Sequence, residues 1–143
     1  MKKRPRWFSL LLYLWVAPVS VLFAPLAWLA KWTGGGYNIH SGVLEIWGGA
    51  VGAWLDRGLP FLGPANAFTV GHVVVGISPQ HLDSSRVHER THVAQFERWG
   101  FLFPLVYLLA GLWVKWQGKR MYWDNPYEIE ARAAATSANK RCD

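Results

Sequence analysis

The sequence predicts an α+β protein in which an N-terminal apolar helix precedes a small antiparallel sheet and three further helices. Three observations support this order. No charged residue occurs between Trp7 and Ala30, residues 36–77 are rich in glycine and β-branched side chains, and helical periodicity begins near residue 83. The composition changes after residue 32, which divides the chain into a membrane segment, 1–32, and a globular domain, 33–143.

The uncharged run from Trp7 to Ala30 is typical of a membrane-spanning helix. Trp7 and Trp28 are separated by about 30 Å along a helix axis, which is the thickness of the hydrocarbon layer. Cations precede the run at Lys2, Lys3, Arg4 and Arg6, so we expect the N-terminus to lie in the cytoplasm. A cleaved signal peptide and a re-entrant segment broken at Pro18 and Pro25 are the alternatives. The side of the membrane that holds the remaining chain stays open.

The segment after this run predicts strands and turns. Tyr37–His40 and Val43–Trp47 are joined by Ser41–Gly42, which predicts a β-hairpin. The glycine-rich residues 48–63 predict little regular structure beyond one helical turn near residues 53–55. A small sheet at this point would lie directly before the helix that carries the most informative motif.

Residues 67–77 are β-branched and aromatic, and they predict a third strand that contains His72. This histidine has three interpretations. It could polarise a substrate carbonyl, it could replace a metal ligand, or it could be a structural strand histidine with neither role. The sequence alone does not choose among them, although a structural role is the more common one.

The segment His88-Glu89-Arg90-Thr91-His92 is the motif that specifies a chemistry. Residues 83–99 contain no Gly or Pro, which predicts a helix that ends at Gly100 and has candidate N-caps at Asp83, Ser84 and Ser85. On a helix, side chains four residues apart lie on the same face, so both imidazoles can bind one metal ion. This is the HExxH arrangement of zinc enzymes. Two structural core histidines would be the alternative reading.

The motif assigns a role to each side chain. We expect His88 and His92 to bind Zn²⁺, which lowers the pKa of a coordinated water to about 7. Glu89 would act as the general base on this zinc-bound water. Gln95 lies on the same helix face as the two histidines and would form hydrogen bonds around the metal site.

The third ligand must come from elsewhere in the chain. Asn125 and Pro126 predict the N-cap and the first residue of a later helix, which carries Glu128 and Glu130. These two carboxylates project about 200° apart, so only one of them can bind the metal. Helical rotation does not choose between them. Glu128 could also close a capping box with Asn125.

A second apolar stretch covers residues 101–114 and is too short to cross a bilayer. We expect it to form a core helix or an interfacial segment that holds the metal site near the membrane surface. The site itself should lie outside the hydrocarbon, because charges surround the motif at Arg86, Arg90, Glu97 and Arg98.

The net charge of +6 suits contact with an anionic membrane, because the basic residues gather at 2–6, at 115–120 and at the C-terminus. No helix carries a stripe of arginine and aromatic residues, and no phosphate-binding glycine loop occurs. The expected partners are therefore membrane lipid and a substrate, with no nucleic acid.

The motifs together resemble a family of short bacterial proteins regarded as membrane-associated metallopeptidases of the Glu-zincin type. The resemblance covers roughly residues 36–135, and rests on Gly71-His72, on His88 to Gly100 and on Asp124 to Ala131. It implies that Glu128, three residues before Ala131, is the third zinc ligand, and that the protein lies in the bacterial inner membrane. Some members carry an iron–sulfur label, which this chain contradicts because Cys142 is its single cysteine.

We therefore expect a membrane-associated zinc metallopeptidase that hydrolyses peptide bonds of a peptide or protein substrate. Its zinc ligands would be His88, His92 and Glu128, with Glu130 as the alternative third ligand. Asn125 would cap the ligand helix. The competing hypothesis is a zinc-binding membrane protein without peptidase activity, either an amidase of envelope material or a catalytically idle scaffold. A purely structural membrane protein would require the two histidines to be coincidental.

Overall fold

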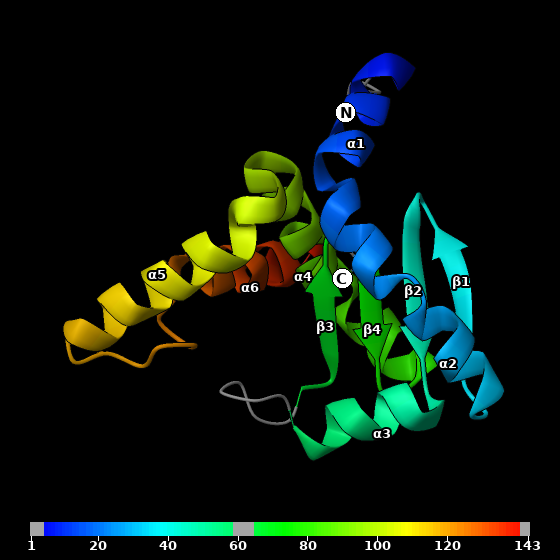
Figure 1. The fold of residues 1–143 in the computed structure, drawn as a ribbon. Helices are drawn as coiled ribbons and strands as arrows, with labels where there is room; N and C mark the ends of the chain where they lie inside the picture. Colours follow the sequence, from blue (N-terminus) through cyan, green and yellow to red (C-terminus); the bar gives the residue numbers. More distant parts are fainter. Residues whose placement is uncertain (1–4, 59–64, 141–143) are drawn as a thin grey trace.

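The computed structural model describes residues 5–58 and 65–140. Within these residues the chain forms six α-helices, a short 3-10 helix and one four-stranded sheet (Figure 1). The expected α+β class is confirmed, with apolar helices first, then the sheet, then the helices that carry the motif and the downstream carboxylates.

The N-terminal apolar run forms two helices instead of one continuous helix. Helix α1 spans Arg6–Phe23 and α2 spans Leu26–Trp32. The break falls at Pro25, because proline lacks an amide proton and its ring collides with the preceding turn. By length and composition alone, two helical stretches are suited to crossing a membrane: Trp7–Trp32, with a mean hydropathy of 2.1, and Pro79–Trp116, with 1.4.

The sheet has the strand order β1-β2-β4-β3. Strands β1 (Gly36–His40) and β2 (Val43–Trp47) form the expected hairpin. Ser41 and Gly42 both have positive φ angles, as two-residue hairpin turns require. The prediction of this hairpin is confirmed.

The prediction of a single third strand over residues 67–77 was wrong. This segment folds into two strands, β3 (Ala67–Val70) and β4 (Val73–Gly76), and the turn between them contains Gly71 and His72. Gly71 has a φ of +64°, which reverses the chain. His72 therefore lies in a turn and not in a strand.

The expected antiparallel sheet is in fact mixed, because β2 and β4 pair in parallel. Helix α3 (Gly49–Arg57) causes this difference. It follows β2 and carries the chain back across the sheet, so that β3 enters at the far edge and β4 returns alongside β2. The single helical turn expected near residues 53–55 is thus a full helix. Residues 59–63 of the glycine-rich segment lie outside the described residues.

Helix α4 (Pro79–Trp99) carries the HExxH motif and begins earlier than predicted. Its N-cap is Ser78, and Pro79 occupies the first turn, where the missing amide proton costs nothing. The predicted caps at Ser84 and Ser85 were wrong, since both hydroxyls donate to the carbonyl of His81 inside the helix. Asp83 likewise lies within the helix. The predicted end at Gly100, which has a φ of +61°, is confirmed.

Three elements follow α4 within the described residues. A 3-10 helix, η1 (Gly100–Leu102), leads directly into α5 (Phe103–Trp116), and a loop then reaches α6 (Pro126–Asn139). Asn125 is the N-cap of α6, as predicted, because its side-chain oxygen accepts a hydrogen bond from the amide of Tyr127.

The two faces of the sheet bury different helices, because side chains alternate along each strand. On one face, Ile46, Val73 and Val75 pack against α2 and α3 through Ala27, Ala30, Val51 and Leu55. On the other face, Val43 and Val74 pack against Leu82 and Val93 of α4. This second face holds the motif helix in place.

Helix α1 packs into the same domain. Val16 is fully buried among Val70, Phe96 and Phe103. The Tyr13 hydroxyl donates to the carbonyl of Gly42 at 2.8 Å, and the amide of His72 donates to the Ser20 hydroxyl at 3.0 Å. The segment 1–32 therefore shares its core with the segment 33–143 where the two are described.

Gly71 provides a test of how α1 is attached. In Gly71→Ala, the added Cβ would collide with the Ser20 hydroxyl and lie 3.0 Å from Val16 Cγ1. We expect a loss of about 1–2 kcal/mol from the left-handed backbone and a further 1–3 kcal/mol from overpacking. Gly118→Ala is the matched control, since Gly118 also has a positive φ but an added Cβ meets nothing within 4 Å. Denaturant titration in detergent micelles gives both free energies of unfolding. Equal losses would contradict tight packing of α1 on this turn.

Candidate metal centre

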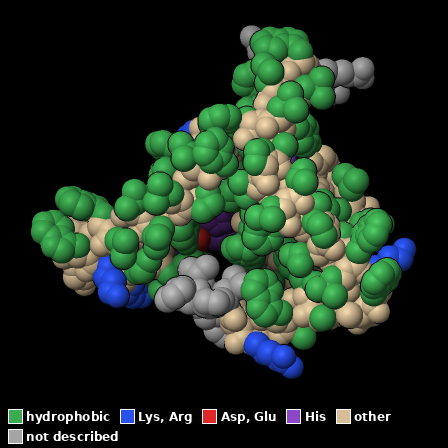
Figure 2. All heavy atoms as spheres, viewed as in Figure 1, with side chains coloured by type: hydrophobic (Ala, Val, Ile, Leu, Met, Phe, Trp, Pro, Cys, Tyr) green, Lys and Arg blue, Asp and Glu red, His purple; other side chains and the backbone are tan. Residues whose placement is uncertain are grey.

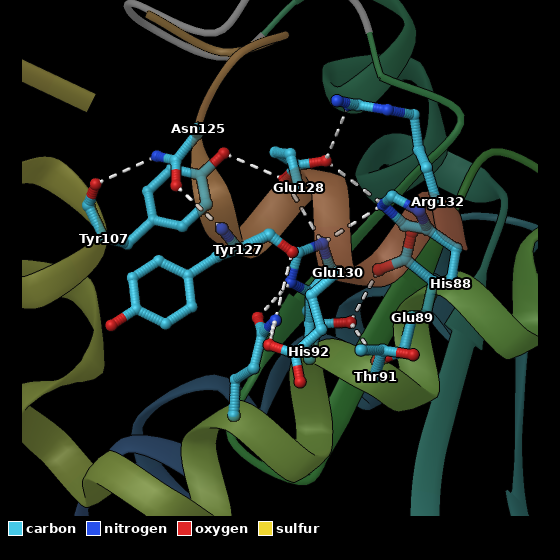
Figure 3. Close-up of polar contacts among 12 residues, drawn as sticks. His88, Glu89, Thr91, His92, Tyr107, Asn125, Tyr127, Glu128, Glu130 and Arg132 are labelled. Atoms are coloured by element: carbon cyan, nitrogen blue, oxygen red, sulfur yellow. Dashed lines mark hydrogen bonds and ion pairs between the residues drawn. The ribbon is translucent and has the colours of Figure 1, made fainter. Parts of the chain in front are cut away.

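Helix α4 presents His88 and His92 one turn apart, and α6 brings Glu128 to the same point (Figure 3). The Nε2 atoms of the two histidines lie 3.1 Å apart. Glu128 Oε2 lies 3.4 Å from Nε2 of His88, and Oε1 lies 3.2 Å from Nε2 of His92. One ligand atom from each residue lies within 4.8 Å of the other two, so this group could hold a metal ion.

The donor set fits a cation on electrostatic grounds. Two facing imidazole nitrogens can share only one proton between them, so at least one lone pair remains directed at the other ring. Glu128 Oε2 is buried and has no hydrogen-bond partner. An unsatisfied buried polar atom costs about 1–3 kcal/mol, and more when it is charged. A metal ion among the three groups would remove this cost.

Gln95 fixes the ring of His92. Its side-chain nitrogen donates to the carbonyl of Tyr127 at 3.0 Å and to Glu130 Oε2 at 2.9 Å. Since the amide nitrogen is occupied, the amide oxygen faces His92 Nδ1 at 2.8 Å and accepts its proton. Nε2 of His92 is then the unprotonated atom that faces the cluster. Metal-binding histidines are commonly oriented in this way by a second hydrogen bond.

The geometry separates the two candidate carboxylates. Glu128 is 3% exposed and lies against the two histidines. Glu130 instead accepts hydrogen bonds from Gln95 and, at 3.3 Å, from Arg98. Ala131, the next residue of α6, is fully buried where α4 and α6 are in contact in this part of the fold. The cluster that could hold a metal thus contains Glu128 and not Glu130.

Hydrogen bonds from α5 hold Glu128 in place. The hydroxyl of Tyr107 donates to Glu128 Oε1 at 2.9 Å. Asn125, which is fully buried, donates from its side-chain nitrogen to the carbonyl of Tyr107 at 3.1 Å while it caps α6. The N-cap therefore ties α6 to α5 at the residue that orients the carboxylate (Figure 3).

The charge state of Glu128 follows from these partners. Burial alone would raise the pKa of this carboxyl group, but the adjacent His88 and His92 rings and the Tyr107 hydroxyl outweigh it and hold the pKa well below its usual range. Arg132, one turn along α6, lies 3.8 Å from Oε2. The Glu128 carboxylate points toward these groups. None of its described hydrogen bonds goes to the backbone amide of Asn125, so it does not form a capping box with that residue.

Glu89 lies beside the cluster but is not part of it. Its carboxylate is buried between α4 and the edge strand β3, where the Thr69 hydroxyl donates to Oε2 at 2.6 Å. Burial raises the pKa of Glu89, and the nearby His92 and the Thr69 hydroxyl oppose this rise without cancelling it. A buried carboxyl group with a raised pKa is a stronger proton acceptor when ionised than one in water.

Like Glu130, His72 is a predicted site residue that lies outside the cluster. Its Nε2 lies 3.4 Å from Glu97 Oε1, and its ring packs on Tyr13 with centroids 4.4 Å apart. These contacts tie the β3–β4 turn to Tyr13 of α1 and to Glu97 of α4. Its Nδ1 is buried without a hydrogen-bond partner.

Sequence reasoning missed three residues that contact the predicted site. Tyr107 carries the one hydroxyl group in the apolar stretch 101–114, and a buried tyrosine hydroxyl requires a partner. Arg132 follows Glu128 by four residues, which is the spacing of a helical ion pair. Thr69 had no such signal, because it approaches Glu89 only through the packing of β3 on α4.

The site opens to the outside. Figure 2 shows a hollow beneath α5 in which histidine and acidic side chains are visible. The side chain of His88 is 19% exposed, which agrees with access from this direction.

Comparison of the chain with protein-family models, curated proteins and solved structures finds no match.

Zinc binding by the purified protein tests the cluster directly. We expect about one zinc ion per chain, lost in His88→Ala and in His92→Ala, because two ligands alone bind weakly. His81→Ala is the control, since His81 lies on the same helix with its ring bonded to Ser78 and outside the cluster. Elemental analysis after dialysis measures the stoichiometry. Unchanged zinc in the His88 and His92 variants would contradict this assignment.

Zinc binding should also release a proton. Burial by itself would lower the pKa of His92, but the neighbouring Glu128 carboxylate outweighs it and raises the pKa above the ordinary value. Below the raised pKa, the ring must lose its proton before zinc binds, so zinc affinity should fall about tenfold per pH unit as the pH decreases. Glu128 contributes no proton near neutral pH, because its pKa is depressed. Calorimetry in buffers of different ionisation enthalpy counts the released protons, and Glu128→Gln should release fewer.

Proposed function

We propose that this protein is a membrane-associated zinc metallopeptidase. The observation that carries the proposal is the cluster of His88, His92 and Glu128 with Glu89 buried next to it as a fourth, non-ligating group. The order of these residues in the chain and the resemblance of their motifs to Glu-zincins support the same conclusion. The proposed location is the bacterial inner membrane.

The donor atoms suit zinc. Two imidazole nitrogens and one carboxylate oxygen are a common protein ligand set of catalytic zinc sites, which keep a further position open. A bound zinc ion supplies Lewis-acid chemistry, since it polarises a carbonyl group and makes water more acidic. Gln95 and Tyr107 support this role, because they orient His92 and Glu128 before any ion arrives.

In this proposal, Glu89 carries out the proton transfers. Its carboxylate accepts a proton from the water molecule that attacks the scissile carbonyl carbon, and then delivers that proton to the leaving amine nitrogen as the C–N bond breaks. Thr69 holds one carboxylate oxygen in place, which leaves the other oxygen for proton transfer. The low polarity around this buried group strengthens it as a base.

A Glu89→Gln variant separates hydrolysis from metal binding. The amide cannot accept the proton, so we expect peptide cleavage to fall by about 10²–10⁴-fold while zinc content remains unchanged. Glu97→Gln is the matched control on the same helix, where the carboxylate faces His72 outside the cluster, and it should retain activity. Mass spectrometry of a peptide library incubated with zinc-loaded protein provides the measurement.

The peptide library, assayed in parallel with purified cell-envelope material, distinguishes the competing function. If the wild-type protein binds zinc and cleaves amides of the envelope material but no library peptide, it is an amidase. If the wild type and the Glu89 variant are equally inactive on every substrate, it is an idle metal-binding scaffold. Cleavage that persists in Glu89→Gln would contradict the role of this residue as base.

A further inference from the structure

Helix α1 has two different sides. One side faces the domain and contains buried Val16 and the half-buried Ser20. The other side is an exposed apolar stripe with helical spacing, made of Trp7, Leu10, Leu11, Leu14, Val21 and Leu22. A helix with this division is covered by protein along one flank and requires an apolar environment along the other.

Charged groups line the protein-facing flank of α1 even near its N-terminal end. Phe8 and Leu12 border a cavity of about 240 Å³ together with Glu97 and Arg98 of α4. If α1 crossed a bilayer along the membrane normal, these two charges would enter the hydrocarbon beside it. Charged side chains at that depth are costly. The structure therefore favours α1 lying along the membrane surface over α1 spanning it.

Helix α5 has a similar exposed stripe. It continues from η1 and consists of Phe101, Leu102, Leu105, Leu108, Leu109, Leu112, Trp113 and Trp116. Fourteen helical residues extend about 21 Å, which is less than the hydrocarbon thickness of about 30 Å. Basic residues follow at Lys115, Lys119 and Arg120. Apolar side chains, tryptophan and adjacent cations are typical of a helix that lies in the interface of an anionic membrane.

The two stripes lie on one face of the molecule. Figure 2 shows hydrophobic side chains covering α1 and α5 on the side in view, with Lys and Arg at the edges of this face. We infer that this docking face, formed by the stripes of α1 and α5, binds the surface of one anionic leaflet without crossing the bilayer. The exposed apolar and tryptophan side chains of the two stripes, together with the basic residues at the edges of the face (Figure 2), identify an anionic lipid surface as its occupant.

The metal cluster opens on this docking face. Helix α5 forms one wall of the site, because Tyr107 reaches Glu128 while Leu105, Leu108 and Leu109 point outward and are about half exposed. The hollow beneath α5 lies on the side in view in Figure 2, within the apolar face. If the proposed hydrolysis is correct, on which this step rests, the substrate is a polypeptide segment that lies at the membrane surface.

Depth measurements with nitroxide labels test the docking without reference to activity. Single cysteines would replace Leu10, Leu14 and Leu22 on α1 and Leu109 on α5, in a Cys142→Ser background with phosphatidylglycerol-containing vesicles. Docking predicts that all four labels contact lipid at a similar shallow depth, while Ser84→Cys, exposed on α4, remains in water. A spanning helix would instead separate Leu10 and Leu22 by about 18 Å along the normal. That gradient, or four labels in water, would overturn the inference.

A tethered substrate tests the second step. The same cleavable peptide would be supplied free in solution and anchored to vesicles by a lipid, with Glu89→Gln as the blank. We expect the anchored peptide to be cleaved at least tenfold faster at equal concentration. Equal cleavage of both peptides would overturn the membrane-surface substrate and leave the proposed hydrolysis intact. Shallow labels with no cleavage of either peptide would support docking and contradict hydrolysis.

Discussion

The contact between α4 and α6 is the constraint on which the site depends. It brings two imidazoles and a carboxylate so close together that their lone pairs face one another, with Glu128 Oε2 left without a hydrogen-bond partner. Such an arrangement is unfavourable in a buried position unless a cation or a proton compensates it. The surrounding residues hold the two imidazoles and the carboxylate in these positions. Gln95 turns His92 so that its free nitrogen points inward, and Tyr107 holds one carboxylate oxygen toward the histidines.

The sequence predicted the local features of this site and missed the tertiary ones. The spacing of His88 and His92 on an uninterrupted helix was sufficient to place both rings on one face. The choice between Glu128 and Glu130 by geometry needed the packing of α6 on α4, which buries Glu128 beside the histidines and leaves Glu130 outside the cluster. Thr69 reaches Glu89 from a strand twenty residues earlier, and no pattern within either segment reveals that contact.

The errors in the predicted fold have similar causes. The strand predicted over residues 67–77 contains valine on both sides of Gly71, so the β-branched pattern concealed the turn that only a positive φ angle permits. The sheet was expected to be antiparallel because α3 was not recognised as a helix, and without a crossover helix a parallel pair cannot form. The start of α4 was missed at Ser78–Pro79, a capping serine followed by a proline suited to a first helical turn.

Helix α5 links the outer surface of the protein to its buried carboxylate. Its leucines are exposed on one side, and on the other side Tyr107 contacts Glu128 through its hydroxyl and Asn125 through its carbonyl. Because the helix is a rigid rod over fourteen residues, rolling it about its own axis would move the hydroxyl and the leucines together. Whatever packs against those leucines therefore also affects how firmly Glu128 is held. The affinity of the proposed site for a metal ion would then depend on the surroundings of the protein.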